Sequence, residues 1–119
     1  MKTATKQETF DLRVVFLQEG SRWTAQGVEF DINASGRTIQ EAQQEFFWAF
    51  IAAIVVRAER GLLDPMRPTA SLPKAPAIFA EHFAEGEPLK EAARYDLPGG
   101  LPEAHVIRSV KSSERRIYQ

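Results

Sequence analysis

The chain has 119 residues and a formal net charge of -1; 44% of its residues are hydrophobic and 26% are charged. This length and composition are typical of a single globular domain and exclude a disordered chain. The near-neutral charge gives no overall attraction to nucleic acid or to anionic membranes. Since the sequence has no cysteine, disulfides and thiol nucleophiles are excluded. The first ten residues lack the apolar segment of a signal peptide, so we expect a cytoplasmic protein.

The first half of the chain predicts three short strands. Residues 10–17 (FDLRVVFL) alternate with the period of two that is typical of a strand, and residues 20–21 suit a tight hairpin turn. A second strand is expected at residues 22–28, where Gly27 indicates a bulge or a close backbone contact. A third short strand is expected at residues 30–35.

A long helix is predicted for residues 38–60. Thr38 and Glu41 have the T-x-x-E spacing of a capping box, and Gly61 is a suitable residue for the C-terminal end. The helix contains the run EFFWAFIAAIVV (residues 45–56), which is apolar from its second residue onward. This run is too short to cross a membrane, because a span needs about 20 apolar residues.

A spacing of 100° per residue gives this helix two apolar faces. The broader face is expected to lie on the sheet and contains Ile39, Ala42, Phe46, Ala49, Phe50, Ala53 and Ile54. A second face, which we name the outer stripe, consists of Phe47, Trp48, Ile51 and Val55. One small sheet can cover only the broader face, so the outer stripe requires a separate explanation.

Two explanations of the outer stripe are open. The second half of the chain could cover it, with Phe79 and Phe83 docking from a short helix. Alternatively, the stripe could contact another protein, since large aromatic residues are enriched at interfaces. We expect a mixture, with intramolecular cover for part of the stripe and a homo-oligomer contact for the rest.

The second half of the chain contains all seven prolines. It is expected to consist mainly of extended segments, with a short helix at residues 76–85, a flexible connector at 97–102 and a fourth strand at 105–110. The predicted organisation is therefore a flexible N-terminus (1–9), a βββα core (10–60) and a proline-rich extension (61–119) that packs on the same domain.

The sequence offers no motif for catalysis or for cofactor binding. His82 and His105 lack metal-ligand spacing, and neither is expected to be catalytic. No nucleophile or phosphate-loop motif is present. We therefore expect no catalytic, cofactor-binding or metal-ligating residues, and a protein that is not an enzyme.

The C-terminal segment carries the main concentration of positive charge. It contains Arg108, Lys111, Arg115 and Arg116. Such a segment can contact phosphate groups, although a basic terminus is more often simply solvated. These four residues are candidate nucleic-acid contacts, and the absence of any salt-dependent RNA affinity would exclude an RNA-binding role.

Residues 22–46 (RWTAQGVEFDINASGRTIQEAQQEF) resemble the HicB-like antitoxin family. The matching elements are Trp23 with Ala25 at the start of the second strand, the segment 32–36 ending in glycine, and the T-x-x-E-A opening of the helix at 38–42. The resemblance extends over residues 10–58, about half of the chain. Each element is short, but their order and spacing together are uncommon.

The resemblance implies an α+β fold with β-β-β-α-β order, similar to a double-stranded-RNA-binding domain or to part of ribonuclease H. It implies a protein that forms dimers or tetramers and neutralises a small RNA-cleaving toxin by binding it. The residues after Gly61 depart from the family, because they show no pair of amphipathic helices for operator binding. The alternatives are an RNA-binding module of this fold and a stand-alone domain with another role.

Overall fold

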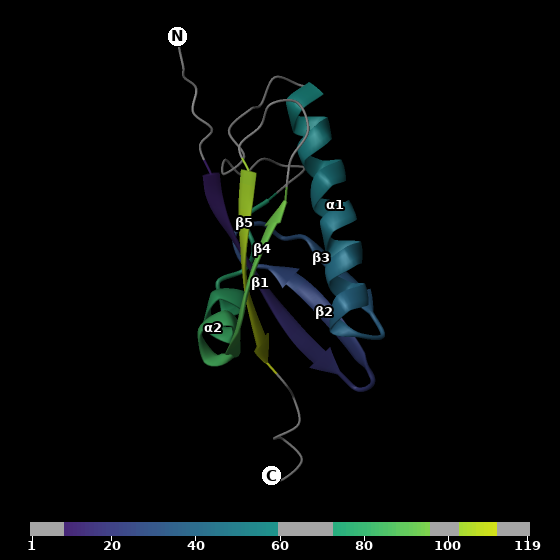
Figure 1. The fold of residues 1–119 in the computed structure, drawn as a ribbon, viewed down its shortest axis with the longest axis vertical. Helices are drawn as coiled ribbons and strands as arrows, with labels where there is room; N and C mark the ends of the chain where they lie inside the picture. Colours follow the sequence, from purple (N-terminus) through teal and green to yellow (C-terminus); the bar gives the residue numbers. More distant parts are fainter. Residues whose placement is uncertain (1–8, 60–72, 96–102, 112–119) are drawn as a thin grey trace.

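The computed structural model describes residues 9–59, 73–95 and 103–111, which form a sheet and two helices (Figure 1). The elements are β1 (Thr9–Glu19), β2 (Arg22–Gly27), β3 (Asn33–Gly36), α1 (Ile39–Glu59), α2 (Ile78–Glu85), β4 (Glu87–Tyr95) and β5 (Glu103–Lys111). The predicted α+β class is confirmed. Three predicted features lie outside the described residues: most of the flexible N-terminus (1–8), the helix end at Gly61 and the connector at 97–102.

The five strands form one mixed sheet with the order β3-β2-β1-β5-β4. The predicted three-stranded meander is confirmed, because β1 pairs antiparallel with β2, and β2 pairs antiparallel with β3. The predicted fourth strand is β5, which lies parallel to β1 and antiparallel to β4. Strand β4 was not predicted, so the expectation of four strands was wrong.

The sequence of β4 explains why it was missed. The strand reads EPLKEAARY, which is rich in charged residues and alanine and has little β-propensity. Pro88 removes one backbone donor, which is tolerated because β4 is an edge strand. The pairing with β5 also shifts register between Leu89 and Ala93, so no alternation runs through the whole strand.

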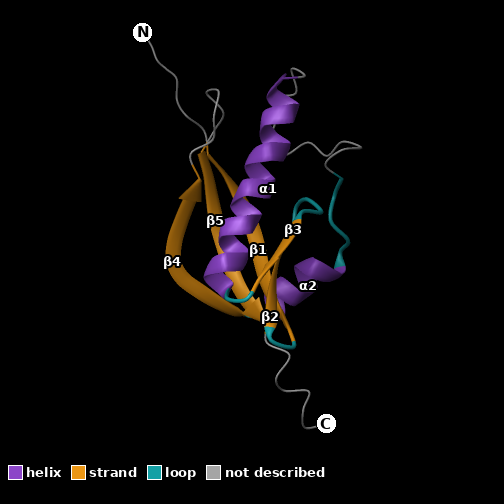
Figure 2. Ribbon diagram, turned by 90° about the vertical axis from the view of Figure 1, so that its right-hand side faces the viewer, coloured by secondary structure: helices purple, strands orange, loops and turns teal. Residues whose placement is uncertain are grey.

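The two helices lie on opposite faces of the sheet (Figures 1 and 2). Alternation along β1 places Leu12 and Val14 in the core under α1. Val15 points to the other face, where it is completely buried. Both faces of β1 are therefore covered at this point of the strand.

Helix α2 packs on β1 and β5, so of the two explanations left open for the outer stripe, docking of Phe79 and Phe83 does not hold. The carbonyl oxygen of Phe83 accepts a hydrogen bond of 2.9 Å from Ser109 Oγ on β5. The guanidinium of Arg13 on β1 lies 5.7 Å from the centre of the Phe83 ring. These contacts fix α2 on the face of the sheet that is remote from α1.

The predicted capping box at the start of α1 is present in a modified form. The backbone N–H of Glu41 donates to Thr38 Oγ1 at 3.0 Å, as the pattern requires. The carboxylate of Glu41 accepts from the backbone N–H of Arg37 at 2.6 Å, one residue earlier than in the standard box. Both side chains thus satisfy backbone donors where the chain enters the helix.

The broad face of α1 packs on the sheet as predicted. Ala42, Phe46, Phe50 and Ile54 are buried, and Ile39, Ala49 and Ala53 are partly buried against the same core. Gly36 allows β3 to approach the start of α1 closely, because a Cβ added to Gly36 would lie 2.5 Å from the Ala42 nitrogen. Phe46 and Phe50 belong to the same buried core as Leu12 and Val14 of β1 and Val106 of β5.

The third strand was predicted at residues 30–35, but β3 begins only at Asn33, and a loop precedes it. Phe30 and Ile32 are buried in this loop, and Phe30 forms an isolated bridge with Lys74. Gly27 makes the close contact predicted for it, since an added Cβ would lie 2.6 Å from the carbonyl oxygen of Phe30. The apolar alternation that predicted a strand thus belongs in part to an inward-turned loop.

Candidate binding surfaces on the long helix

The outer stripe runs from the edge of the core to solvent. Phe47 is partly buried and packs against the core, while Ile51 and Val55 are also partly buried. Trp48 is 57% exposed. Its ring meets the ring of Phe47 edge-to-face, with 5.4 Å between the centroids. The two aromatic residues therefore form one unit that is anchored in the core and ends at the surface.

This arrangement is suited to contact with another protein. An exposed tryptophan offers a large apolar area and an N–H donor on a side chain with few rotatable bonds. The helix beneath it is rigid, because its opposite face is buried. Within the part of the chain that the structure describes, the other exposed large hydrophobic residues are Ile78 and Ile107, and neither belongs to α1.

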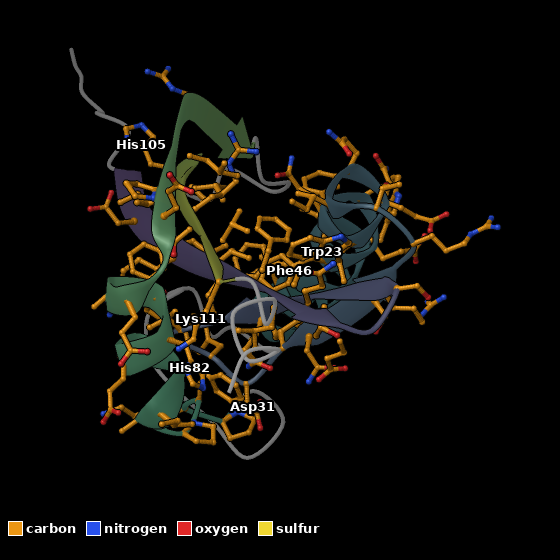
Figure 3. All side chains as sticks on the ribbon, turned by 90° about the horizontal axis from the view of Figure 1, so that it is seen from below. Trp23, Asp31, Phe46, His82, His105 and Lys111 are labelled. Atoms are coloured by element: carbon orange, nitrogen blue, oxygen red, sulfur yellow. The ribbon has the colours of Figure 1, made fainter. Side chains whose placement is uncertain are left out.

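Arg108 and Lys111, the two basic residues of the C-terminal segment that the structure describes, lie on opposite sides of the sheet. Arg108 lies on the α1 side of β5, where its Nη1 donates to Gln43 Oε1 at 2.6 Å. Lys111 points to the other side and pairs with Glu85 of α2. Figure 3 shows Lys111 beside α2, together with His82. Arg115 and Arg116 lie outside the described residues, so nucleic-acid contact by this segment stays a prediction.

A groove that was not predicted lies between the N-terminal end of α1 and the strands of the sheet. Its volume is about 720 Å³, and its lining comes from β2, α1 and the β4–β5 pair. The described lining residues are Trp23, Arg37, Thr38, Ile39, Gln40, Gln43, Leu89 and Arg108. The groove exists because α1 lies closest to β2 and β3, leaving the α1 side of β4 and β5 less covered.

Arg108 is the residue from which the groove could have been suspected. In the alternation along β5, it occupies the same face as the buried Val106 and the half-buried Val110. An arginine in a core-facing row needs a polar environment, since burying a charge among apolar groups is costly. The opposite wall of the groove includes Leu89 of the unpredicted strand β4, so the groove could not be predicted from the sequence alone.

The two histidines lie on different elements, and each is near one carboxylate. His82 on α2 has its Nδ1 3.9 Å from Glu85 Oε1, and its ring lies 6.1 Å from that of Phe79. His105 on β5 has its Nδ1 4.0 Å from Asp11 Oδ1 of the neighbouring strand. Figure 3 shows the two histidines well apart from each other. They are not brought together into one site.

In the described ranges 9–59, 73–95 and 103–111, no group of three or more acidic or histidine side chains is placed to hold a metal ion.

The apolar run of α1 was expected to be too short to cross a membrane. Among the described helices, none has the length and apolar character that crossing a bilayer requires. Comparison of the chain with protein-family models, curated proteins and solved structures gives no match.

Proposed function

We propose that this chain is a non-enzymatic, HicB-like protein that acts by binding other proteins through the outer stripe of α1. Its partners are a second copy of itself and a small RNA-cleaving toxin, which it neutralises. The exposed Trp48 on the rigid helix is the observation that carries the protein-binding part of the proposal. The toxin as partner is supported by the resemblance of residues 22–46 to the HicB-like antitoxins.

Two further observations support a binding role. The rings of Phe47 and Trp48 are in edge-to-face contact. A partner that binds at Trp48 would therefore contact a pre-organised surface rather than a mobile side chain. The helix α2 is fixed to the remote face of the sheet through Ser109 and Lys111, so it does not cover this stripe. The stripe is therefore available to a partner at Trp48.

Co-expression with the product of the adjacent reading frame tests this function. If that product is a toxin, its expression alone should stop growth, and wild-type chain should restore growth. Trp48→Glu should abolish the rescue, because the carboxylate would be desolvated in the interface. Since Trp48 is 57% exposed, this variant should still fold.

Ala84→Glu is the matched control, because it introduces the same side chain at an exposed helical position on α2, which lies on the face of the sheet remote from Trp48. This variant should rescue growth as well as the wild type does. An adjacent product without toxicity would argue against the antitoxin role. Rescue by Trp48→Glu at the wild-type level would remove the outer stripe from the binding surface.

A further inference from the structure

We infer that the groove at the start of α1 is a binding site for a small organic anion, which has a carboxylate or phosphate group attached to an apolar or aromatic body. The inference concerns residues outside the outer stripe and does not depend on the proposed partners. It rests on the charge, the chemistry and the size of the groove lining.

The charge of the groove favours an anion. Arg37 contributes one guanidinium from the entry to α1, and Arg108 contributes another from β5. None of the lining residues that the structure describes is acidic, although the whole chain has a net charge of -1. Guanidinium groups bind carboxylates and phosphates through charge-assisted and often paired hydrogen bonds.

The arginines are held differently. Arg108 is half-buried and oriented by its 2.6 Å hydrogen bond to Gln43, so its position is fixed before any ligand enters. The side chain of Arg37 is 80% exposed, and its Nε lies 3.9 Å from Glu41 Oε1. An exposed pair of this length is weak, which leaves Arg37 able to turn toward a bound anion.

The remainder of the lining favours an apolar body on the ligand. Trp23, Ile39 and Leu89 supply apolar surface, and Gln40 and Gln43 supply amide groups that can donate or accept hydrogen bonds. Trp23 packs partly against the core, so the side of the groove that it forms is rigid.

The size of the groove limits the ligand. Small-molecule sites usually have volumes of roughly 300–1,000 Å³ and combine apolar walls with a few oriented polar groups. The groove, at about 720 Å³, falls within this range. It has room for one ring or a branched chain together with the anionic group.

NMR titration of the full chain tests the inference directly, because Trp23 reports from inside the groove. The sequence contains two tryptophans, so Trp48→Phe assigns the indole N–H signals. Phenyl phosphate and phenylacetate serve as probes, while inorganic phosphate and benzyl alcohol each present one half of the proposed ligand. At least one of the two organic anions should shift the Trp23 signal with saturation, and each half alone should bind at least about tenfold more weakly.

Substitution of the arginines distinguishes the groove from non-specific binding. Arg108→Gln should weaken the affinity about tenfold, and Arg37→Gln should weaken it less, about threefold, because Arg37 is exposed. Arg22→Gln is the control, since it makes the same charge change next to Trp23 in sequence but on the opposite face of β2. Arg37→Gln keeps the test decisive if Arg108→Gln disturbs the fold.

A response to phenyl phosphate alone would identify the phosphate class, and a response to phenylacetate alone would identify the carboxylate class. The inference is overturned if neither organic anion gives a saturable shift of Trp23. It is also overturned if benzyl alcohol binds as tightly as the anions, if Trp48 responds instead of Trp23, or if Arg22→Gln weakens binding as much as Arg37→Gln does.

Discussion

Two aromatic residues of α1, Phe50 and Trp48, should respond very differently to replacement by alanine. Phe50 is completely buried in the core between α1 and the sheet. Its removal leaves a cavity that the packed neighbours cannot fill, so Phe50→Ala should lower the free energy of unfolding by about 3–5 kcal/mol. A single domain is stable by only about 5–15 kcal/mol, so this loss is a large part of the total.

The expected loss for Trp48→Ala is smaller. Since the residue is 57% exposed, less than half of its surface is removed from water. A tryptophan side chain of about 250 Å² then buries roughly 100 Å², which at about 25 cal/mol per Å² gives at most about 2.5 kcal/mol. Partial burial in the unfolded chain and the better helix propensity of alanine reduce this loss to about 1–2 kcal/mol.

Urea denaturation followed by far-ultraviolet circular dichroism measures both losses. The two variants should be compared with the wild type at two protein concentrations, because self-association through Trp48 would make the wild-type stability depend on concentration. The packing account predicts that Phe50→Ala is the more destabilising by at least about 1 kcal/mol. A loss for Trp48→Ala that equals or exceeds the loss for Phe50→Ala would refute the assignment of the two faces of α1.

Three smaller effects on the free energy of unfolding follow from side-chain hydrogen bonds, and urea or thermal unfolding measures each. Thr38→Ala should cost about 1 kcal/mol, because the hydroxyl accepts an N–H in the first turn of α1; Thr38→Ser should retain most of it. Glu29→Ala should cost about 1–3 kcal/mol, because its carboxylate accepts both the backbone N–H and the Nε–H of Arg13; an unchanged midpoint would show that water replaces it. Ser109→Ala should cost about 1 kcal/mol and increase amide exchange in α2, whereas unaltered exchange there would contradict the role of this bond as an anchor.

The parts of the fold that could be predicted depend on local signals. The alternation in β1, the two-residue turn after Glu19 and the T-x-x-E pattern at Thr38 each act within a few residues. The sheet-facing side of α1 was predictable for the same reason, since its period of 3.6 is visible in the sequence. These elements were found at nearly the expected positions.

The parts that could not be predicted depend on distant contacts. Strand β4 gains its conformation from pairing with β5, because its own sequence is poor in strand-forming residues. The side of the sheet on which α2 lies is set by groups far apart in the sequence, among them Arg13 and Ser109. The groove was missed for a related reason, because Arg108 and Leu89 become its wall only when β4 and β5 pair.

Sedimentation equilibrium of the wild type and Trp48→Glu tests the central claim, which is that the outer stripe of α1 binds another protein chain. The account predicts that the wild type associates with rising concentration, that Trp48→Glu remains monomeric and that Ala84→Glu associates as the wild type does. A wild type that stays strictly monomeric at high concentration, or an association that Trp48→Glu leaves unchanged, would contradict it.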